Sequence, residues 1–412
     1  MPSIEKLSLP AVLITAFRPK VKAFLRSLVC AVLFLLACVV PSQAKSPDPS
    51  FYDATLAEAA LPPGTLLKAE RMPLPPLYRA KAWRMLYATR DTFGRPIVSS
   101  GMAIISTVPQ RQPGPRKIVA WAHPTTGTKR ACAPSLAKTP HKTIVGIDEF
   151  VSLGYAVVAT DYPGLGTPGP TGYLVGKGQA YATLDAIRAM QQIANHGTGK
   201  DVVLFGYSQG GHAAIFASLL ASRYAPGYAI RGVAAIAPPT DLRRLLLANI
   251  GSIEGRVLAG FTLQSWAVKY GLSMRDVASE NSLAAILAIN KQCIDTVDGQ
   301  IGVLKAQKKL GKSFLLYDPG TVKGWNTALR DNSLTSLAVD MPALVIQGDS
   351  DDIVRPNVTL DTVRASCRAG TRVKFVSLAG RGHTTAPQFG VGEAVQWISE
   401  RFAGLPAPSN CR

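Results

Sequence analysis

One stretch decides the fold: Val202-Val203-Leu204-Phe205-Gly206-Tyr207-Ser208-Gln209-Gly210. Its first four residues are continuously apolar, a pattern typical of a strand that is buried on both faces of a parallel sheet. Glycine lies two positions before and two positions after the serine, and residues 210–224 have the composition of a helix. A strand, a tight turn and a helix in this order present the serine hydroxyl at the helix amino terminus. The stretch therefore predicts an α/β sheet with an exposed Ser208, rather than a serine that only caps a helix.

Short apolar runs of the same kind recur along the chain and alternate with helical stretches such as residues 178–194. Two earlier β-like runs, residues 83–88 and 97–107, follow a proline-rich segment (47–76) and are separated by a turn-like sequence, which is a hairpin pattern. The alternation predicts a mostly parallel α/β sheet with an antiparallel amino-terminal hairpin. Further buried strands are expected at residues 118–122, 156–160, 233–236, 343–346 and 373–376.

The alternation is interrupted between residues 241 and 337, where the sequence is mostly helical in character. A length of 412 residues allows two or three domains, but this interval falls between two expected strands of one sheet. A structureless insertion of that length is uncommon. We therefore expect residues 45–240 and 338–412 to form one core, and residues 241–337 to form a helical cap or lid. Helices are expected there at residues 242–250, 282–289 and 300–310.

Residues 1–44 have the pattern of an export signal. A cationic stretch ending at Arg26 precedes the apolar run 27–40, and the small residues after it predict cleavage before Lys45. The apolar run is shorter than the roughly 20 residues that a transmembrane helix needs. Leu35-Leu36-Ala37-Cys38 is also similar to a bacterial lipoprotein processing box. The mature protein is thus expected to be secreted or periplasmic, or alternatively anchored by a lipid at Cys38.

The chain is strongly basic, with 45 Lys and Arg against 26 Asp and Glu and a net charge of +19. Such a balance raises nucleic acid as a partner. The cations, however, are scattered, with no run of five or more and no interleaved aromatic residues of the kind that stack on bases. We expect no nucleic-acid partner. A basic surface that transiently approaches an anionic membrane or lipid, or that simply aids solubility, is the preferred interpretation.

A serine hydroxyl becomes a good nucleophile only when a base takes its proton and a third group orients the base. In hydrolases with this kind of serine turn, the order along the chain is serine, acid, histidine. Of the five histidines, His383 alone lies downstream of a plausible acid, in a glycine-containing loop after residues 373–376. We therefore predict Ser208 as nucleophile and His383 as base. The alternative is that His383 is an ordinary surface-loop histidine.

The acid is expected just after the strand 343–346, where three carboxylates lie within four positions. Only one of them can face the histidine. Asp351 is preferred, three residues after Gly348 and three before Val354, and Asp352 is the alternative. Asp349 is then a solvated loop acid or a group that supports the site from outside.

An acyl-transfer site also needs N–H donors for the oxyanion, each worth about 3 kcal/mol in the transition state. One is expected from the backbone of Gln209, the residue after the serine. The other is expected from the loop that follows residues 118–122 and begins at His123. Pro124 has no N–H, so Thr125 is the candidate, helped by its hydroxyl. Otherwise this loop is merely a turn, and His123 is expected to be structural rather than catalytic.

With these residues in view, the chain resembles the secretory lipase family of α/β hydrolases, particularly its bacterial branch. The resemblance covers residues 77–411 and is specific only when its segments are taken together. One departure is Pro124, because similar bacterial sequences usually have glycine after the loop histidine. The segments are Trp121-Ala122-His123-Pro124-Thr125-Thr126-Gly127, Cys132-Ala133-Pro134-Ser135, Asp161-Tyr162-Pro163-Gly164-Leu165-Gly166-Thr167-Pro168-Gly169 with Tyr173-Leu174-Val175-Gly176, and residues 206–211.

The family pattern implies Ser208, Asp351 and His383 as a catalytic triad, in agreement with the choice made from spacing. Outside the leader the chain has four cysteines and no CxxC pair, so a metal site is not expected, and three disulfide pairings are possible. The resemblance implies two disulfides, each worth about 2 to 4 kcal/mol by restricting the unfolded chain. These pairs are Cys132 with Cys293 and Cys367 with Cys411.

The preferred function is a secreted serine carboxylester hydrolase, a lipase or esterase that forms an acyl-enzyme and needs no cofactor. The cap would form the acyl pocket, and five apolar residues are candidates either to line it or to pack in the cap's own core. Alternatives on the same fold are a peptidase or amidase, for which no acidic clamp for a substrate amine is seen, and an acyltransferase. A non-catalytic lipid-binding envelope protein is the third possibility. The five cap residues are Leu245, Leu246, Leu247, Phe261 and Trp266.

Overall fold

The structure, a computed structural model, describes residues 48–110, 113–193, 197–310, 314–338 and 340–411. The predicted leader (1–44), its cleavage before Lys45 and the alternative lipid anchor at Cys38 lie outside the described residues. Within those ranges, no helix has both the length and the hydrophobicity required to cross a bilayer.

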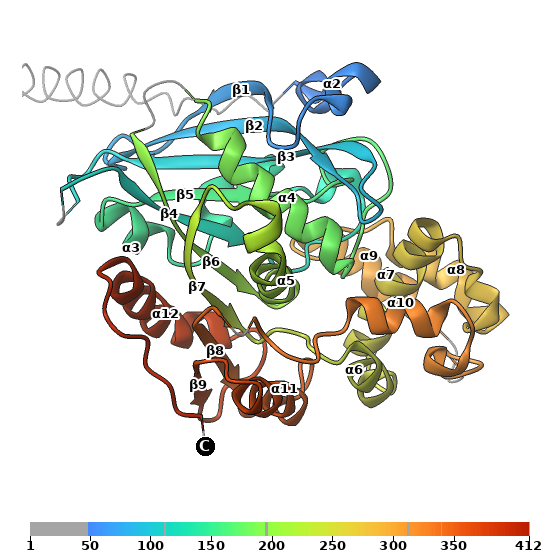
Figure 1. Cartoon of the computed structure of the whole chain (residues 1–412). Helices are drawn as coiled ribbons and strands as arrows, with labels where there is room; N and C mark the ends of the chain where they lie inside the picture. The colour runs from blue at the N-terminus through green and yellow to red at the C-terminus, as the bar shows by residue number, and fades with distance from the viewer. Residues whose placement is uncertain (1–47, 111–112, 194–196, 311–313, 339, 412) are drawn as a thin grey trace, which may run out of the picture. The chain divides into compact units, whose positions relative to one another are not determined.

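The strands of the described residues form one nine-stranded sheet in the order β1-β2-β3-β5-β4-β6-β7-β8-β9 (Figure 1). β1, β2 and β3 are antiparallel neighbours, β3 also pairs antiparallel with β5, and the pairings from β5 through β4 to β9 are parallel. The predicted fold class is therefore confirmed. The strands are β1 (Leu66–Met72), β2 (Ala80–Arg90), β3 (Pro96–Ser106), β4 (Arg116–Ala122), β5 (Ala156–Thr160), β6 (Thr198–Tyr207), β7 (Ala229–Ile236), β8 (Ala343–Gly348) and β9 (Val373–Leu378).

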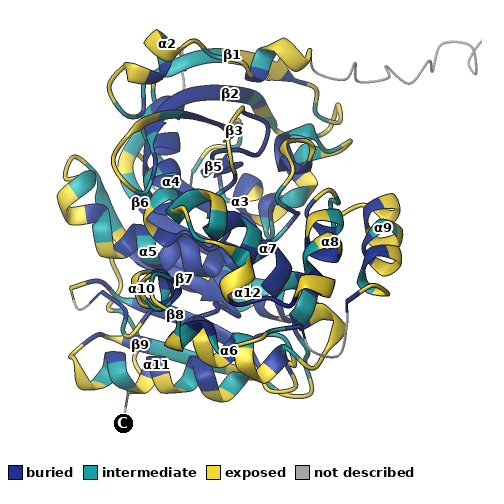
Figure 2. Ribbon diagram, turned by 90° about the vertical axis from the view of Figure 1, so that its right-hand side faces the viewer, coloured by how far each residue is buried: buried dark blue, intermediate teal, exposed yellow. Residues whose placement is uncertain are grey.

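Helices cover both faces of the sheet, which explains why the central strands are apolar at every position. In β6, Val202 and Leu204 belong to one apolar cluster, together with residues of α4 (Gly176–Met190) and α5 (Gln209–Tyr224). The alternate residues Val203 and Phe205 belong to a second cluster, together with residues of α3 (Ile147–Ser152) and α12 (Ala386–Phe402). Side chains on a strand point alternately to its two faces, so both sets are buried (Figure 2).

A group of helices that we call the inserted helices lies between β7 and β8, and has an apolar core of its own. Phe261, Trp266 and Trp325 are each no more than 1% exposed in this core. Three of these helices, α6, α8 and α9, overlap the predicted ones, whereas α7 and α10 were not predicted from the sequence. The inserted helices are α6 (Leu242–Asn249), α7 (Ile253–Tyr270), α8 (Glu280–Ile289), α9 (Val297–Gln307) and α10 (Trp325–Asn332).

The strand β1 lies in a segment that the sequence analysis treated only as a proline-rich lead-in. It is an edge strand whose middle is exposed, and it carries charged residues, so it lacks the buried apolar run that identified the other strands.

The remaining described helices are α2 (Leu56–Ala60), α11 (Pro356–Arg368) and the short 3₁₀ turns η1 (Pro49–Tyr52), η2 (Arg130–Cys132), η3 (Pro134–Leu136), η4 (Pro140–Thr143), η5 (Met274–Asp276) and η6 (Pro319–Thr321).

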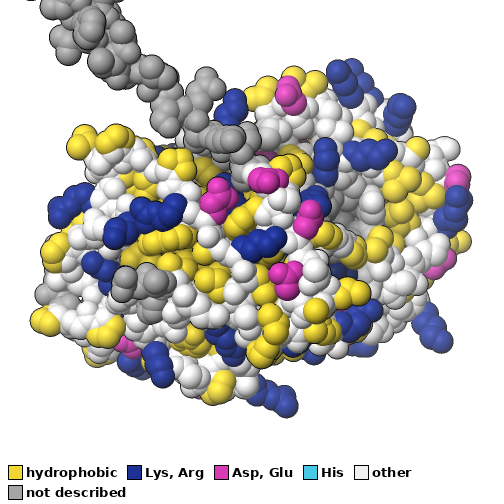
Figure 3. All heavy atoms as spheres, turned by 90° about the horizontal axis from the view of Figure 1, so that it is seen from above, with side chains coloured by type: hydrophobic (Ala, Val, Ile, Leu, Met, Phe, Trp, Pro, Cys, Tyr) yellow, Lys and Arg dark blue, Asp and Glu magenta, His cyan; other side chains and the backbone are white. Residues whose placement is uncertain are grey.

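The positive charge is dispersed on the face of the molecule that Figure 3 draws. Lys and Arg side chains lie there singly or in small groups among hydrophobic and uncharged ones, with a few acidic side chains between them (Figure 3). A continuous basic band of the kind that follows a nucleic-acid backbone is not seen on this face.

Candidate active site

Ser208 lies at the sharp turn between β6 and α5, in a backbone conformation that is unusual for a residue with a side chain. Its φ is 54° and its ψ is −122°. The backbone N–H of Ser208 donates to the carbonyl oxygen of Ile236 on the neighbouring strand at 2.8 Å, which holds the turn against the sheet. Conformations of this kind persist where the surroundings enforce them, and they cluster at functional sites.

The two glycines that flank the turn are required by space rather than by φ. A Cβ on Gly206 would lie 2.1 Å from the carbonyl oxygen of Gly210, and a Cβ on Gly210 would lie 1.8 Å from the carbonyl oxygen of Ala122. Ala122 is the last residue of β4 and pairs with Gly206 across the sheet. The missing side chains let the start of α5 approach the end of β4, so the serine turn and the loop after β4 lie side by side.

His383 joins Ser208 to Asp351 in one hydrogen-bonded chain. The Nε2 of His383 lies 2.9 Å from the Oγ of Ser208, and its Nδ1 lies 2.8 Å from the Oδ2 of Asp351. His383 is 9% exposed and Asp351 is 2% exposed. With Nδ1–H donating to the carboxylate, Nε2 is free to accept the serine proton, which is the arrangement that general-base activation requires.

The carboxylate of Asp351 is held by three further donors. Its Oδ1 accepts from the backbone N–H groups of Ile353 and Val354 at 2.9 and 2.7 Å. Its Oδ2 accepts from the side-chain amide of Gln347 at 2.9 Å. These bonds fix the oxygen that faces His383. This role of Gln347 was not predicted from the sequence, in which the residue only follows the apolar run of a buried strand.

The other two acidic residues of this loop lie elsewhere. Asp352, the alternative acid, is exposed to solvent. Asp349 accepts a hydrogen bond from the backbone N–H of Gly380 at 2.7 Å, and so it ties the loop after β8 to the loop after β9. A Cβ on Gly348 would lie 2.2 Å from the carbonyl oxygen of Arg381, so this glycine allows the same two loops to approach.

The two expected oxyanion donors, Thr125 and Gln209, lie on the two adjoining segments beside the serine. Gln209 is the first residue of α5, where backbone N–H groups point outward with the positive end of the helix dipole. Neither backbone N–H donates to another described residue. The Thr125 hydroxyl lies 3.1 Å from the hydroxyl of Tyr173, and burial raises the pKa of Tyr173 to about 12.

A pocket opens beside Ser208 and Gln209. No charged side chain is among its described lining residues, which come mostly from α6, α7 and the loop after β8. Two of the five predicted cap residues, Leu245 and Leu246, line it. Phe261 and Trp266 are buried in the core of the inserted helices, which is the alternative that the sequence left open. Leu247 does neither, because it is 40% exposed, so the expectation was wrong for this residue. Hydrophobicity alone did not distinguish the two environments.

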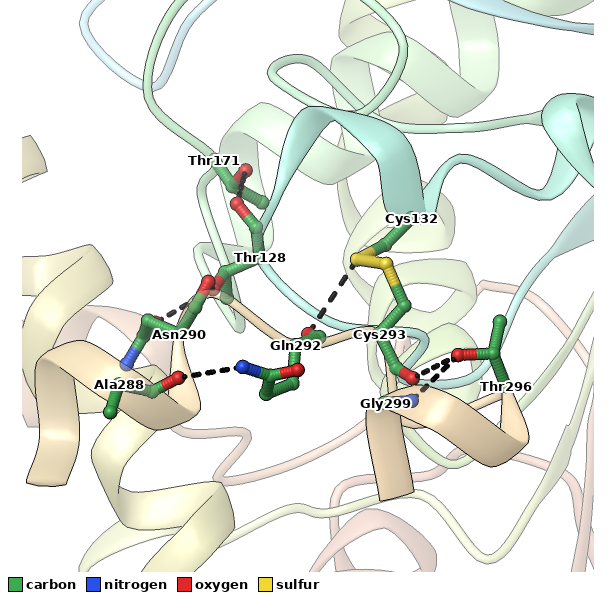
Figure 4. The surroundings of a disulfide bond; sticks show 9 residues. All are labelled: Thr128, Cys132, Thr171, Ala288, Asn290, Gln292, Cys293, Thr296 and Gly299. Carbon is green, nitrogen blue, oxygen red and sulfur yellow. Dashed lines mark hydrogen bonds between the residues drawn. A yellow bond between two sulfur atoms is a disulfide. The ribbon is translucent and has the colours of Figure 1, made fainter. Parts of the chain in front are cut away.

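The disulfide Cys132–Cys293 fastens the inserted helices to the loop after β4 (Figure 4). The backbone N–H of Ile294 donates to the carbonyl oxygen of Thr126 at 2.8 Å, and the hydroxyl of Thr128 donates to the side chain of Asn290 at 2.7 Å. A Cβ on Gly127 would lie 2.7 Å from the Sγ of Cys132, so only glycine fits between the disulfide and the loop. We call this set of contacts the clasp.

The second disulfide joins Cys367, near the end of α11, to Cys411. Both pairs are those that the resemblance implies. Among the described residues, no group of three or more His, Cys, Asp and Glu side chains is placed to hold a metal ion.

Comparison with known sequences gives one family and a set of relatives. A family model described as secretory lipase matches residues 139–410. Lipase 5 of Candida albicans is 28% identical over 420 residues, which cover 92% of this chain and 87% of the relative. Lipase A of Moesziomyces aphidis is 24% identical over 394 residues, which cover 88% of this chain and 82% of the relative.

Two solved structures have the same fold at low sequence identity. Candida antarctica lipase A in its closed state superposes with a TM-score of 0.75 at 20% identity, and the match covers 88% of this chain and 90% of that one. A ligand-bound form of LipA from Xanthomonas oryzae, described as a rice cell wall degrading esterase, superposes with a TM-score of 0.65 at 20% identity. That match covers 83% of this chain and 98% of LipA.

Proposed function

The chain belongs to the secretory lipase family, and from this premise we propose that it is a secreted serine carboxylester hydrolase with Ser208, His383 and Asp351 as its catalytic triad. The observation that carries the proposal is the hydrogen-bonded chain from serine to histidine to carboxylate, at 2.9 and 2.8 Å. These are the distances at which a base can take the serine proton without further movement.

The reaction follows from the position of each group. The Oγ of Ser208 attacks the ester carbonyl carbon while its proton passes to the Nε2 of His383, and Asp351 stabilises the imidazolium that forms. His383 then gives that proton to the leaving alkoxide, which departs as an alcohol and leaves an acyl group on Ser208. A water molecule, deprotonated by the same histidine, attacks the acyl group; the bond from the acyl carbon to the Oγ of Ser208 then breaks, the histidine returns the proton to that oxygen, and the acid is released.

The negative charge of each tetrahedral intermediate falls on the former carbonyl oxygen. We assign its stabilisation to the backbone N–H groups of Thr125 and Gln209, which lie beside the serine and donate to no other described residue. Donors already in place where charge develops cost no reorganisation during the reaction.

The pocket beside Ser208 supports an apolar acyl group as the bound portion of the substrate. Its lining includes leucines of α6 and α7 and no described charged side chain. A peptidase of this fold that recognises a free amine needs a carboxylate near the site, so the pocket favours esters of fatty acids over aminoacyl amides. We propose that residues 241–337 act as the cap that shapes this pocket.

Export of the mature chain is part of the proposal. Two disulfides join distant parts of the described chain, at sequence separations of 161 and 44 residues. Structural disulfides persist in oxidising compartments such as the periplasm or the extracellular space. Together with the export pattern of residues 1–44, they support secretion after removal of a signal peptide.

The decisive experiment is covalent labelling by a fluorophosphonate, with turnover of p-nitrophenyl esters measured in parallel. Ser208→Ala is expected to abolish labelling and to lower kcat by about 10⁴-fold or more. Ser399→Ala, which removes a hydroxyl bonded within α12, is the matched control and is expected to keep both. Turnover at the wild-type rate in Ser208→Ala would overturn the proposal, and a wild-type protein that takes no label would be a binding protein instead.

The substrate class is tested by comparing butyrate esters, long-chain triglycerides and aminoacyl amides. Hydrolysis of the esters with little activity on the amides is expected. The pocket can make apolar contacts with an acyl chain, whereas none of its described lining residues carries a negative charge that would bind a substrate ammonium group. A preference for the amides would instead identify a peptidase on the same fold.

A further inference from the structure

His123 begins the loop after β4, and both nitrogens of its buried ring face carbonyl oxygens. The side chain is 1% exposed. Its Nδ1 lies 2.6 Å from the carbonyl oxygen of Pro124, and its Nε2 lies 3.0 Å from the carbonyl oxygen of Asp161. A carbonyl oxygen only accepts hydrogen bonds, and a neutral imidazole has a single N–H. A neutral ring would therefore turn a lone pair toward one of these oxygens, whereas an imidazolium satisfies both.

A counter-charge for such an imidazolium is present in Asp161, which follows β5 and is 0% exposed. Its carboxylate accepts from the backbone N–H of Ser135 at 2.9 Å and from the hydroxyls of Ser135 and Ser100 at 2.5 and 2.7 Å. Burial is the largest influence on both groups: it lowers the pKa of His123 and raises the pKa of Asp161, because each charge loses contact with water. The attraction between the two groups and the hydrogen bonds to each act in the opposite sense and offset part of that effect.

Tyr162 and the serine turn enclose His123 from two further sides. The Tyr162 ring lies 4.3 Å from the His123 ring at an interplanar angle of 31°, a position in which an aromatic face attracts a cation. The Tyr162 hydroxyl donates to the carbonyl oxygen of His123 at 3.2 Å. A Cβ on Gly210 would lie 2.8 Å from that same oxygen, so the residue touches the start of α5.

The bond to Pro124 matters because a peptide unit is planar and trans. The carbonyl of Pro124 and the N–H of Thr125 belong to one such unit, so they point in opposite directions. Fixing the carbonyl toward His123 therefore fixes the direction of the Thr125 N–H. A positive charge on the donor also polarises the peptide and strengthens that N–H as a donor.

We propose that His123 is a buried imidazolium, stabilised by the negative charge of the nearby Asp161, and that it positions the oxyanion donor of Thr125 because both of its ring nitrogens are hydrogen-bonded to carbonyl oxygens. His123 touches no reacting atom in this scheme, so it is a positioning residue. The kinetic part of the proposal rests on the proposed function, while the protonation state does not.

The protonation state is tested by nitrogen NMR of the full-length folded protein labelled with ¹⁵N-histidine at neutral pH. Two protonated ring nitrogens are expected for His123, assigned by their loss in His123→Gln. His212 is an internal comparison, because its Nε2 lies 2.8 Å from the carbonyl oxygen of Asn332 and its buried Nδ1 has no partner among the described residues. In Asp161→Asn the imidazolium signals are expected to convert to those of a neutral ring. One bare nitrogen on His123 in the wild-type protein overturns the proposal.

The kinetic consequence is a split between kcat and KM. In His123→Gln, kcat on p-nitrophenyl butyrate is expected to fall about 10- to 100-fold with KM within about twofold, because the oxyanion forms only after substrate has bound. His212→Gln, which alters another buried histidine, is expected to change neither constant by more than about threefold. An unchanged kcat in His123→Gln overturns the positioning role. If that variant does not fold, Asp161→Asn provides the same comparison.

The two proposals fail in different ways. If the wild-type protein takes no fluorophosphonate label, the proposed hydrolase function fails, yet the NMR spectrum still decides whether His123 is an imidazolium. If Ser208 is labelled and His123 is neutral, the hydrolase remains and only the present inference is lost.

Discussion

The hydroxyl of Tyr207 donates a hydrogen bond of 2.9 Å to the backbone carbonyl oxygen of His383. Tyr207 immediately precedes Ser208, so the residue before the proposed nucleophile holds the chain segment that carries His383, the proposed base. The two rings also lie 5.3 Å apart at an interplanar angle of 34°. The position of the histidine relative to the serine therefore depends on a contact that originates within the serine turn itself.

Removal of that hydroxyl is expected to loosen the base without affecting substrate binding. In Tyr207→Phe we expect kcat on p-nitrophenyl esters to fall about 5- to 10-fold with KM nearly unchanged, which is the effect of losing about one buried hydrogen bond. Tyr228→Phe is a suitable control, because its hydroxyl donates to Gln191 at 3.0 Å, away from the proposed catalytic residues. Equal effects of the two substitutions on kcat would contradict a positioning role for Tyr207.

The two neighbouring acids are expected to differ sharply in their effect. Asp351→Asn should lower kcat by about 10⁴-fold, because an amide cannot hold the histidine in the tautomer that accepts the serine proton. Asp352→Asn should remain within about threefold of the wild type, because its side chain is exposed. Steady-state kinetics on one ester substrate separate the two, and a large loss in Asp352→Asn would require a different acid.

A methyl group added at the serine turn is expected to be far more damaging than one added on a distant helix. Gly210→Ala places a Cβ 1.8 Å from the carbonyl oxygen of Ala122 and should cost about 3 kcal/mol or displace α5 from the sheet. Gly392→Ala, in α12, meets nothing within 4 Å and should raise stability by about 0.5 to 1 kcal/mol. Urea denaturation followed by fluorescence measures both changes. A Gly210→Ala protein as stable as the wild type would rule out the close approach.

Acid is expected to destabilise the protein through His212. Burial lowers the pKa of His212 to about 4, whereas an unfolded histidine has a pKa of about 6.5. Between these values the unfolded chain binds a proton that the folded chain does not, so stability falls as the pH falls from about 6.5 toward 4 and is fully present above that range. The largest loss from this residue is about 3 kcal/mol. In His212→Gln the free energy of unfolding should depend less on pH over that interval, and an unchanged slope would contradict the assignment.

The sequence predicted the buried part of the fold well because a strand that is covered on both faces needs apolar residues at every position. β5 has the predicted bounds, and the start of α5 lies one residue before the predicted one. β1 was missed because an edge strand needs no such run. The helix α7 was missed although Ser252 caps its start and Gly271 ends it in the left-handed conformation, at a φ of 68°.

The candidate site divides in a similar way. The turn around Ser208 is a local pattern, and the order of acid and histidine along the chain follows from the fold, so the three residues could be proposed from the sequence. The contacts that support them could not be. Gln347 on Asp351 and Tyr207 on His383 depend on which side chains meet after folding. Whether Phe261 faced the pocket or the core of the inserted helices depended on the same long-range packing.

The clasp has a mechanical consequence for how substrate enters. Cys293 forms a disulfide with Cys132, and the backbone N–H of Ile294 donates to the carbonyl oxygen of Thr126. A rigid-body movement of α8 and α9 would therefore also move the loop after β4, which contains Thr125. A large movement on that side would displace the backbone N–H of Thr125 that we propose as an oxyanion donor. If the proposed function holds, we therefore expect long acyl chains to enter by adjustment of α6 and α7, while the segment around Cys293 stays in place.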